Sequence, residues 1–214
     1  MTSFLRITEI FYSIQGESNS VGWPTVFIRL TGCPLRCQYC DTAYAFHGGK
    51  NFSLSEILDR VKEFNTRYIT VTGGEPLAQP ACLSLMEMLC DQNYIVSLET
   101  SGALDVSKVD SRVIRVIDLK APGSSEVHRN LWSNISWLKS NDQIKFVISN
   151  HQDYLWSKEI LNQYHLSDIC TVLFSPSFGQ VENQQLAEWI LKDQLPVRFQ
   201  TQLHKVIWGD IPGK

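Results

Sequence analysis

The fold is decided by residues 25–42, which read Thr-Val-Phe-Ile-Arg-Leu-Thr-Gly-Cys-Pro-Leu-Arg-Cys-Gln-Tyr-Cys-Asp-Thr. The first six residues are rich in β-branched and apolar side chains, which predicts a strand over 25–30. The loop that follows carries Cys33, Cys37 and Cys40. In a reducing compartment, cysteines clustered in this way indicate a metal or redox site before they indicate disulfides.

The other three cysteines have a different setting. Cys82, Cys90 and Cys170 are scattered through apolar segments. A free cysteine in such a segment behaves as a small hydrophobic residue, so we expect all three to be buried in the core.

Outward from this loop, strand-like and helical patterns alternate along the chain. Further strands are expected over 68–72, 94–99, 113–120, 143–149, 171–174 and 196–200. Helices are expected from the capping box at Ser53 through Phe64, over 81–90, 152–164 and 182–192, and with a weaker pattern over 131–138.

This alternation is typical of a mainly parallel sheet. A closed barrel of eight strand–helix units typically needs about 250 residues, whereas this chain has 214. We therefore expect an α/β fold, an open partial barrel of the (βα)6 type, and a single domain over residues 1–214.

Alternation within the strands sorts polar from apolar side chains. In 25–30, Val26, Ile28 and Leu30 share one face and Arg29 lies on the other. The same pattern predicts an interior polar set: Arg29, Thr72, Glu99, Asp118, Lys120, Lys145 and Arg198. At the carboxyl ends of the strands this set would form a pocket suited to a small anionic ligand. A shift of one residue in register would instead turn Lys145 and Arg198 outward.

The spacing of the three loop cysteines suits an iron–sulfur cluster. Three thiolates can bind three corners of a cubane and leave the fourth iron without a protein ligand, open to a substrate or cosubstrate. Zinc usually takes four ligands from paired motifs. The only nearby fourth donor is His47, and no second cysteine pair exists, so a cluster is the favoured interpretation.

The Cys-x-x-x-Cys-x-x-Cys spacing, with Tyr39 before the third cysteine, resembles the radical S-adenosylmethionine (SAM) superfamily. Gly73-Gly74-Glu75-Pro76, at the end of the second predicted strand, is similar to the motif with which that superfamily holds the SAM amino group. The resemblance implies a [4Fe–4S] cluster whose electron cleaves SAM to a carbon radical.

Shorter motifs narrow the family. Ser13–Ser18, Cys40-Asp41-Thr42, Glu99-Thr100-Ser101-Gly102, Asp118-Leu119-Lys120 and the tail around His204 and Trp208 together resemble the 7-carboxy-7-deazaguanine synthase family, from Ile10 to the C-terminus. This resemblance implies conversion of 6-carboxy-5,6,7,8-tetrahydropterin to 7-carboxy-7-deazaguanine with loss of ammonia, in the pathway to queuosine and other 7-deazapurines. It also implies catalytic use of SAM and a need for Mg²⁺.

The resemblance assigns roles residue by residue, with no protein side chain as the catalyst because the radical comes from SAM. The cluster ligands would be Cys33, Cys37 and Cys40, and the Mg²⁺ ligand would be Thr42. SAM would meet Tyr39, Cys40, Asp41, Gly74, Glu75, Glu99, Asp118, Leu119, Lys120, Phe174, Ser175, Pro176 and Ser177. The substrate would meet Ile14, Gln15, Gly16, Glu17, Arg29, Thr72, His204 and the carboxylate of Lys214.

Composition sets the expected partners and location. A net charge of −3 gives no electrostatic case for nucleic acid or an anionic membrane. No apolar run approaches the roughly 20 residues that span a bilayer, and the first ten residues lack a signal-peptide pattern. We expect a cytoplasmic enzyme; the resemblance adds a flavodoxin or ferredoxin as electron donor, and a homodimer.

Two other functions remain open. A glycyl-radical activase also carries Cys-Pro-Leu-x-Cys-x-Tyr-Cys, but it would act on a protein and would not use the Ile-Gln-Gly-Glu segment or the tail. An electron carrier or sensor would bind the cluster without chemistry of its own, and would need neither Gly-Gly-Glu-Pro nor Glu-Thr-Ser-Gly.

Overall fold

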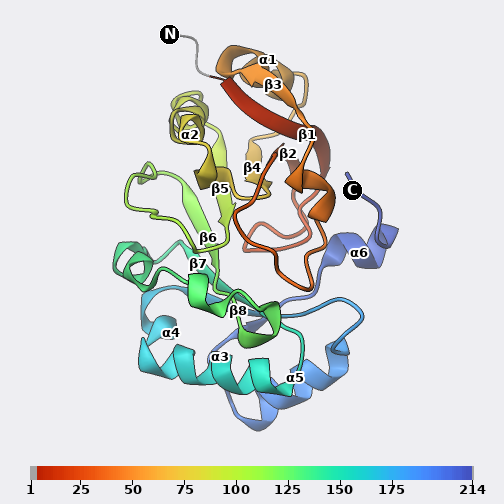
Figure 1. Ribbon diagram of the computed structural model, residues 1–214, viewed down its shortest axis with the longest axis vertical. Coiled ribbons are helices and arrows are strands. Elements are labelled where there is room, and N and C mark those ends of the chain that lie inside the picture. The colour runs from red at the N-terminus through yellow and green to blue at the C-terminus, as the bar shows by residue number, and fades with distance from the viewer. Residues whose placement is uncertain (1–3, 214) are drawn as a thin grey trace.

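One sheet of nine strands runs through the computed structural model, which describes residues 4–213 (Figure 1). The strands are β1 (Phe4–Ile14), β2 (Pro24–Leu30), β3 (Lys50–Ser53), β4 (Tyr68–Gly73), β5 (Ile95–Thr100), β6 (Ile114–Asp118), β7 (Gln143–Ile148), β8 (Thr171–Pro176) and β9 (Arg198–Phe199). Their order is β3-β1-β2-β4-β5-β6-β7-β8-β9. All neighbours from β2 to β9 are parallel, and β1 is antiparallel to β2 and β3. The expected open partial barrel is confirmed.

Helices cover the outer face of this sheet. They are α1 (Leu54–Lys62), α2 (Ala81–Asp91), α3 (His151–Gln163), α4 (Leu166–Ile169) and α5 (Asn183–Lys192). The remaining helix, α6 (Leu203–Trp208), lies at the cavity instead. α1 and α2 lie toward β3 and β5, whereas α3, α4 and α5 lie toward β7, β8 and β9 (Figure 1). Among residues 4–213 no helix is long and apolar enough to cross a membrane.

The main helices form where the sequence predicts them, within two residues at each end. The capping box at the start of α1 is confirmed, because the Glu56 amide donates to Ser53 Oγ at 3.2 Å and the Ser53 amide donates to Glu56 Oε2 at 2.7 Å. The apolar stripe of this helix, Leu54, Ile57, Leu58 and Val61, is buried.

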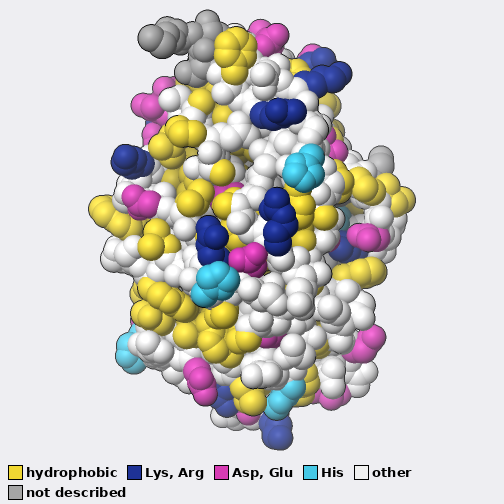
Figure 2. Space-filling model, viewed as in Figure 1, with side chains coloured by type: hydrophobic (Ala, Val, Ile, Leu, Met, Phe, Trp, Pro, Cys, Tyr) yellow, Lys and Arg dark blue, Asp and Glu magenta, His cyan; other side chains and the backbone are white. Residues whose placement is uncertain are grey.

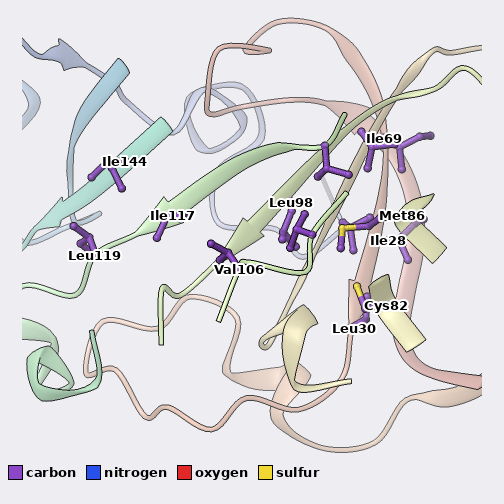
Figure 3. Packing of buried hydrophobic residues seen from close by; sticks show 14 of the residues in the cluster. Ile28, Leu30, Ile69, Cys82, Met86, Leu98, Val106, Ile117, Leu119 and Ile144 are labelled. Atoms are coloured by element: carbon purple, nitrogen blue, oxygen red, sulfur yellow. The ribbon is translucent and has the colours of Figure 1, made fainter. Parts of the chain in front are cut away.

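The hydrophobic core lies between the sheet and the helices. Ile28, Leu30 and Ile69 from the strands pack with Cys82 and Met86 from α2 (Figure 3). Cys90 and Cys170 are buried in the same cluster, which confirms the interpretation of the three outlying cysteines. With the outer face apolar, the polar side chains of the strands lie on the inner face.

Several elements differ from the expectation, and the short helices α4 and α6 are two that were not predicted. β1 and β3 were not predicted; β1 carries an irregularity in its pairing between Ile7 and Glu9, which breaks the alternation that marks a strand. The helix expected over 131–138 is a short 3₁₀ helix, η5 (Trp132–Trp137). The buried Asn134 side chain explains this, since it bonds the backbone of Gly102, Leu104 and Val106 and so ties the segment to the loop after β5.

Candidate active site

A cavity of about 410 Å³ opens at the carboxyl ends of the parallel strands. Most of the side chains that the sequence assigns to cofactor or substrate meet there. Those lining it are Ile14, Gln15, Glu17, Arg29, Cys33, Cys37, Tyr39, Cys40, Asp41, Thr42, Thr72, Gly74, Glu99, Asp118, Lys120, Ser175, Pro176, Ser177 and His204. Gly16, Glu75, Leu119 and Phe174 do not line it. Lys214 lies outside the described residues.

The cysteine loop, residues 32–40, follows β2 directly. Its backbone is held from both sides, because the Gly32 amide donates to the carbonyl of Ala45 at 2.8 Å and the Gln38 amide donates to that of Ser124 at 3.1 Å. Ser124 belongs to η3 (Pro122–Ser124). The loop after β6 therefore supports the cysteine loop, a role that sequence reasoning left open.

The three loop thiols fit an iron–sulfur cluster. Each is free and partly buried, and all three line the cavity. Burial raises their pKa, that of Cys37 to about 11, while Lys120 opposes the shift at each of them. Since only the thiolate binds metal, Lys120 favours the form that holds iron.

Within residues 4–213, no three Cys, His, Asp or Glu side chains are grouped as ligands of one metal ion would be. The ligands of a cubane cluster can lie farther apart than the ligands of a single ion, because each thiolate binds its own iron. A cluster therefore needs three thiols that line one common space. Cys33, Cys37 and Cys40 all line the cavity and meet this requirement.

Gly73 and Gly74 lie where the end of β4 touches the end of β2. The Gly74 amide donates to the carbonyl of Leu30 at 3.0 Å, and a Cβ on Gly74 would fall on the backbone of Gly32 and Cys33. Gly73 has a φ of +139° and packs equally closely on Leu30. The two glycines thus let the cysteine loop approach β4, in addition to any approach to a ligand.

Glu75 points away from the cavity into the protein. Its carboxylate is fully buried and accepts from Thr100 Oγ1 at 2.8 Å, the Ser101 amide at 2.7 Å and the Leu77 amide at 3.0 Å. In this arrangement the Glu75 side chain has no surface open to the cavity, so the expected contact with SAM would have to come from its backbone. Glu75 instead ties the Gly-Gly-Glu-Pro motif to the Glu-Thr-Ser-Gly motif.

Leu119 and Phe174 are likewise limited to backbone contact with SAM. Both side chains are in the hydrophobic core, with 1% and 0% of their surface exposed. Each alternates along its strand with residues that do line the cavity, Asp118 and Lys120 in one case and Ser175 in the other. Alternation turns them outward, so only their backbone could meet SAM.

A chain of buried charges crosses the cavity floor. Lys145 Nζ lies 2.7 Å from Glu17 Oε2 and 3.6 Å from Asp118 Oδ2, and Lys120 Nζ lies 3.2 Å from that same oxygen. Burial alone would lower the pKa of Lys145, but Glu17 and Asp118 raise it well above its usual value. Asp118 Oδ1 is buried without a partner among the described residues, which makes it a ready acceptor for a ligand donor.

Lys145 lines the cavity, as predicted. Arg198 shares its face of the sheet, because Leu173 pairs with both residues, but Arg198 does not line the cavity. Arg198 is exposed, and its Nη1 donates to Asn19 Oδ1 at 2.8 Å. It begins the two-residue strand β9, whose loop partner Asn19 turns it away from the cavity.

Arg29 is held by residues that sequence reasoning missed. Its Nε donates to Glu9 Oε1 at 2.7 Å, and Tyr44 Oη donates to the same oxygen at 2.8 Å. The guanidinium lies 5.6 Å from the ring centre of Phe11. Glu9 and Phe11 could not be placed from sequence because β1 itself was not recognised.

Thr72 and Gln15 converge on Glu99. Thr72 Oγ1 donates to Glu99 Oε2 at 3.0 Å, and Gln15 Nε2 lies 3.4 Å from Glu99 Oε1. Burial and the nearby Glu17 raise the pKa of Glu99. The carboxyl group is thus oriented by β4 and by the residue that follows β1, and it can accept or donate a hydrogen bond.

The short helix α6 closes one side of the cavity. The Leu203 amide donates to the Gly16 carbonyl at 3.0 Å, and Gln202 Nε2 donates to Glu17 Oε1 at 2.9 Å. A Cβ on Gly16 would collide with His204, which explains why Gly16 is needed although it does not line the cavity. Burial lowers the pKa of His204.

Asp41 and Thr42 lie opposite α6. Thr42 Oγ1 donates to Asp41 Oδ1 at 2.9 Å, and Lys205 Nζ lies 3.4 Å from Asp41 Oδ2. Partial burial would raise the pKa of Asp41, yet Lys205 and the bonds from Thr42 and Gln202 lower it to about 2. An anionic carboxylate therefore lies beside the Thr42 hydroxyl.

Known proteins match this chain along most of its length. The Radical SAM superfamily matches residues 27–120. The 7-carboxy-7-deazaguanine synthase of Chlorobaculum tepidum is 47% identical, covering 96% of this chain and 94% of the relative. That of Thermoplasma acidophilum is 35% identical, with 98% and 100% covered. The crystal structure of QueE from Escherichia coli has a TM-score of 0.78 at 21% identity, over 94% of this chain and 95% of that one.

An open parallel sheet with three thiols at its carboxyl edge defines a radical SAM enzyme, whose cofactors are a [4Fe–4S] cluster and SAM. More narrowly, the chain belongs to the 7-carboxy-7-deazaguanine synthase family.

Proposed function

We propose that this enzyme converts 6-carboxy-5,6,7,8-tetrahydropterin to 7-carboxy-7-deazaguanine, a step toward queuosine and other 7-deazapurines. Substrate and product differ by one ammonia, and the hydrogen taken from carbon 6 is later returned, so SAM is regenerated. The observation that carries the proposal is that Arg29 and Thr42 share one cavity with Cys33, Cys37 and Cys40.

When bound, the cluster supplies one electron that cleaves SAM to methionine and a 5′-deoxyadenosyl radical. Cys33, Cys37 and Cys40 would hold it, and the loop after β6 keeps their backbone in place. SAM would lie between the cysteine loop and the ends of β6 and β8, meeting Asp118, Lys120 and Ser175–Ser177. Glu75, Leu119 and Phe174 would shape this side without direct side-chain contact.

The substrate would lie on the opposite side. The planar guanidinium of Arg29 matches the two oxygens of a pterin carboxylate. Gln15, Glu17, Thr72, Glu99 and His204 supply both donors and acceptors for the amino and carbonyl edge of the ring. Burying the carboxylate without such partners would cost several kcal/mol.

Mg²⁺ would bind at Thr42. A hard cation prefers oxygen ligands, and the Thr42 hydroxyl faces the cavity beside the anionic Asp41. Substrate oxygens and water would complete its coordination. Replacing Thr42 by Ala should therefore slow turnover and weaken its dependence on Mg²⁺, with the affinity for SAM unchanged.

The deciding experiment is anaerobic reconstitution followed by assay with dithionite, SAM, Mg²⁺ and carboxytetrahydropterin, with the 7-deazapurine product followed by mass spectrometry. The wild-type enzyme should form the 7-deazapurine product, and Arg29→Ala should sharply raise the KM for carboxytetrahydropterin. Cleavage of SAM without product would favour an activase, and cluster reduction without SAM cleavage would favour a carrier or sensor.

A further inference from the structure

The loop between β1 and β2, residues 15–23, reaches across the open side of the partial barrel. The sheet ends at β3 and β9, and within residues 4–213 β9 does not pair with β1. The β1–β2 loop nevertheless contacts β9, since Arg198 Nη1 donates to Asn19 Oδ1 at 2.8 Å. Side chains therefore join the two parts of the barrel that no strand pairing joins.

Two buried glutamines hold the backbone of this loop. The Ser18 amide donates to Gln200 Oε1 at 2.6 Å, and the Asn19 amide donates to Gln143 Oε1 at 2.8 Å. Gln143 is the first residue of β7, and Gln200 directly follows β9. We call Gln143 and Gln200 the glutamine clamp, because they hold two successive amides of one loop.

The burial of the clamp is unusual for polar side chains. Such side chains mostly lie on the surface, as Lys, Arg, Asp, Glu and His do on the face shown in Figure 2. Gln143 and Gln200 are only 1% and 4% exposed. Burying an amide costs free energy unless it is hydrogen-bonded, and Gln200 Nε2 is buried with no partner among the described residues. The bond from Ser18 to Oε1 is therefore what favours glutamine over an apolar side chain at position 200.

The same bond falls on a residue with a strained backbone. Ser18 has a φ of +65°, in the left-handed region that residues other than glycine seldom occupy. Such a conformation persists where the surrounding structure determines it, and it is found most often at functional sites. Ser18 directly follows Glu17, so the backbone that Gln200 holds sets the direction in which Glu17 leaves the loop.

Glu17 is the cavity residue that depends most on the clamp. Gln15 lines the cavity from the same loop, but it has an anchor of its own, since its Nε2 donates to Thr70 Oγ1 on β4 at 3.0 Å. The Glu17 amide donates to Gln15 Oε1 at 3.1 Å, which fixes the backbone before Glu17. After Glu17, the Ser18 amide bonds to Gln200. The Glu17 carboxylate can meet Lys145 only if both sides of its backbone stay in place.

We propose that Gln143 and Gln200 are positioning residues that hold Glu17 in place for the substrate. The inference rests on the proposed function, because it takes the carboxypterin as the ligand that Glu17 meets. Neither glutamine is among the described residues that line the cavity. Both therefore act through the loop, and neither touches the ligand.

The test removes the acceptor and roughly keeps the side-chain volume. Gln200→Met should raise the KM for carboxytetrahydropterin about tenfold and leave kcat within about twofold, because a displaced Glu17 weakens ground-state and transition-state binding alike. Gln143→Met should act in the same direction. Gln200→Glu keeps an oxygen for the Ser18 amide in either protonation state, so its KM should stay within about threefold of wild type. Iron content and SAM affinity should be unchanged in all three variants.

A double-mutant cycle separates positioning from a general structural effect. If Gln200 acts through Glu17, adding Gln200→Met to Glu17→Ala should raise KM by less than about twofold beyond Glu17→Ala alone. Independent effects would instead multiply and give the full tenfold again. Ile57→Val, at a fully buried residue of α1, is the control for lost stability and should leave KM unchanged.

An unchanged KM in Gln200→Met, or a full tenfold loss on top of Glu17→Ala, would overturn the proposal. Failure of the proposed function looks different, because the wild type itself would then form no 7-deazapurine. Hydrogen exchange at residues 17–19, measured with SAM and without pterin, then tests the clamp separately. Exchange should speed up in Gln200→Met but not in Gln200→Glu or Ile57→Val, and unaltered exchange in Gln200→Met would also overturn the proposal.

Discussion

At the scale of single residues, the candidate site depends on side chains that hold others in place. Arg29 faces the cavity, but Glu9 and Tyr44 behind it set the plane of its guanidinium. Lys145 faces the cavity as well, but its ion pairs with Glu17 and Asp118 join the substrate side to the SAM side. The orientation of a group aimed at a ligand is thus fixed before the ligand arrives.

The role of Glu9 is testable by comparing two substitutions. Glu9→Ala should raise the KM for carboxytetrahydropterin about tenfold with little change in kcat, because Arg29 loses its orientation. Glu9→Gln keeps the acceptor and should stay within about twofold of wild type. A lower KM for Glu9→Ala would show that Glu9 competes with the substrate for Arg29 instead of orienting it.

The cysteines separate into two groups with opposite expectations. Replacing Cys33, Cys37 or Cys40 by Ala should abolish cluster binding, since each thiolate holds a different iron. Cys82→Ala removes a fully buried core side chain and should lower stability slightly while leaving iron content unchanged. Iron per chain and visible absorbance after anaerobic reconstitution check this. Full iron in the triple loop variant would contradict the assigned ligands.

At the scale of elements, local patterns were predictable from sequence and distant pairings were not. The capping box of α1 and the parallel strands follow from contiguous residues. β1 was not recognisable in the sequence, because the irregularity in its pairing interrupts the alternation of apolar and polar residues. α6 has six residues and no buried stripe, and its place depends on Gly16, which is remote in sequence. The inward position of Arg29, Thr72, Glu99 and Lys145 was predictable because alternation alone determines it; the outward position of Leu119 and Phe174 follows from the same rule.

The docking of α6 can be tested through Gly16. Gly16→Ala should displace His204 and loosen α6, since the added Cβ has no room. Hydrogen exchange over residues 203–208 should speed up and KM for the pterin should rise. Gly22→Ala is the control, because it lies in the same loop with open space around it. Its φ of +89° gives this control a backbone cost that Gly16→Ala does not have, so any greater effect of Gly16→Ala comes from the contact with His204. Unaltered exchange in Gly16→Ala would mean that α6 docks independently of this contact.

The link between the Gly-Gly-Glu-Pro and Glu-Thr-Ser-Gly motifs is a stability element. Glu75→Gln places an amide donor against the Ser101 amide donor, so the free energy of unfolding should fall by about 2–3 kcal/mol. Denaturant unfolding measures this loss. Iron content should be retained, because Glu75 is not a cluster ligand. If SAM affinity falls while stability is unaltered, Glu75 contacts SAM after all.

At the scale of the whole molecule, most of the described residues assigned to cofactor or substrate line one cavity. The cavity is lined by loops that follow β2, β4, β5, β6 and β8. A ligand bound there contacts segments that are far apart in the sequence, and it should therefore stabilise the fold as a unit.

Ligand stabilisation gives a prediction for the complete protein. At about one hundred times its Kd, SAM should add about 2.7 kcal/mol, which raises Tm by roughly 5–10 °C for a domain of this size. The reconstituted wild type should show this shift in calorimetry. The Cys33→Ala, Cys37→Ala, Cys40→Ala triple variant should show little of it, because SAM loses the open iron. Equal shifts in both proteins would place SAM away from the cluster.

The contact between Gly74 and the backbone of Gly32 and Cys33 has a consequence for protein design. The cysteine loop and the Gly-Gly-Glu-Pro segment form one close joint, because the backbone of Gly32 and Cys33 leaves no room for a side chain at position 74. Transplanting the cysteine loop alone onto another parallel sheet should misplace its first thiol by the width of a methyl group. A working graft must carry both strand ends together, so the smallest portable unit of this chemistry is a pair of neighbouring strands.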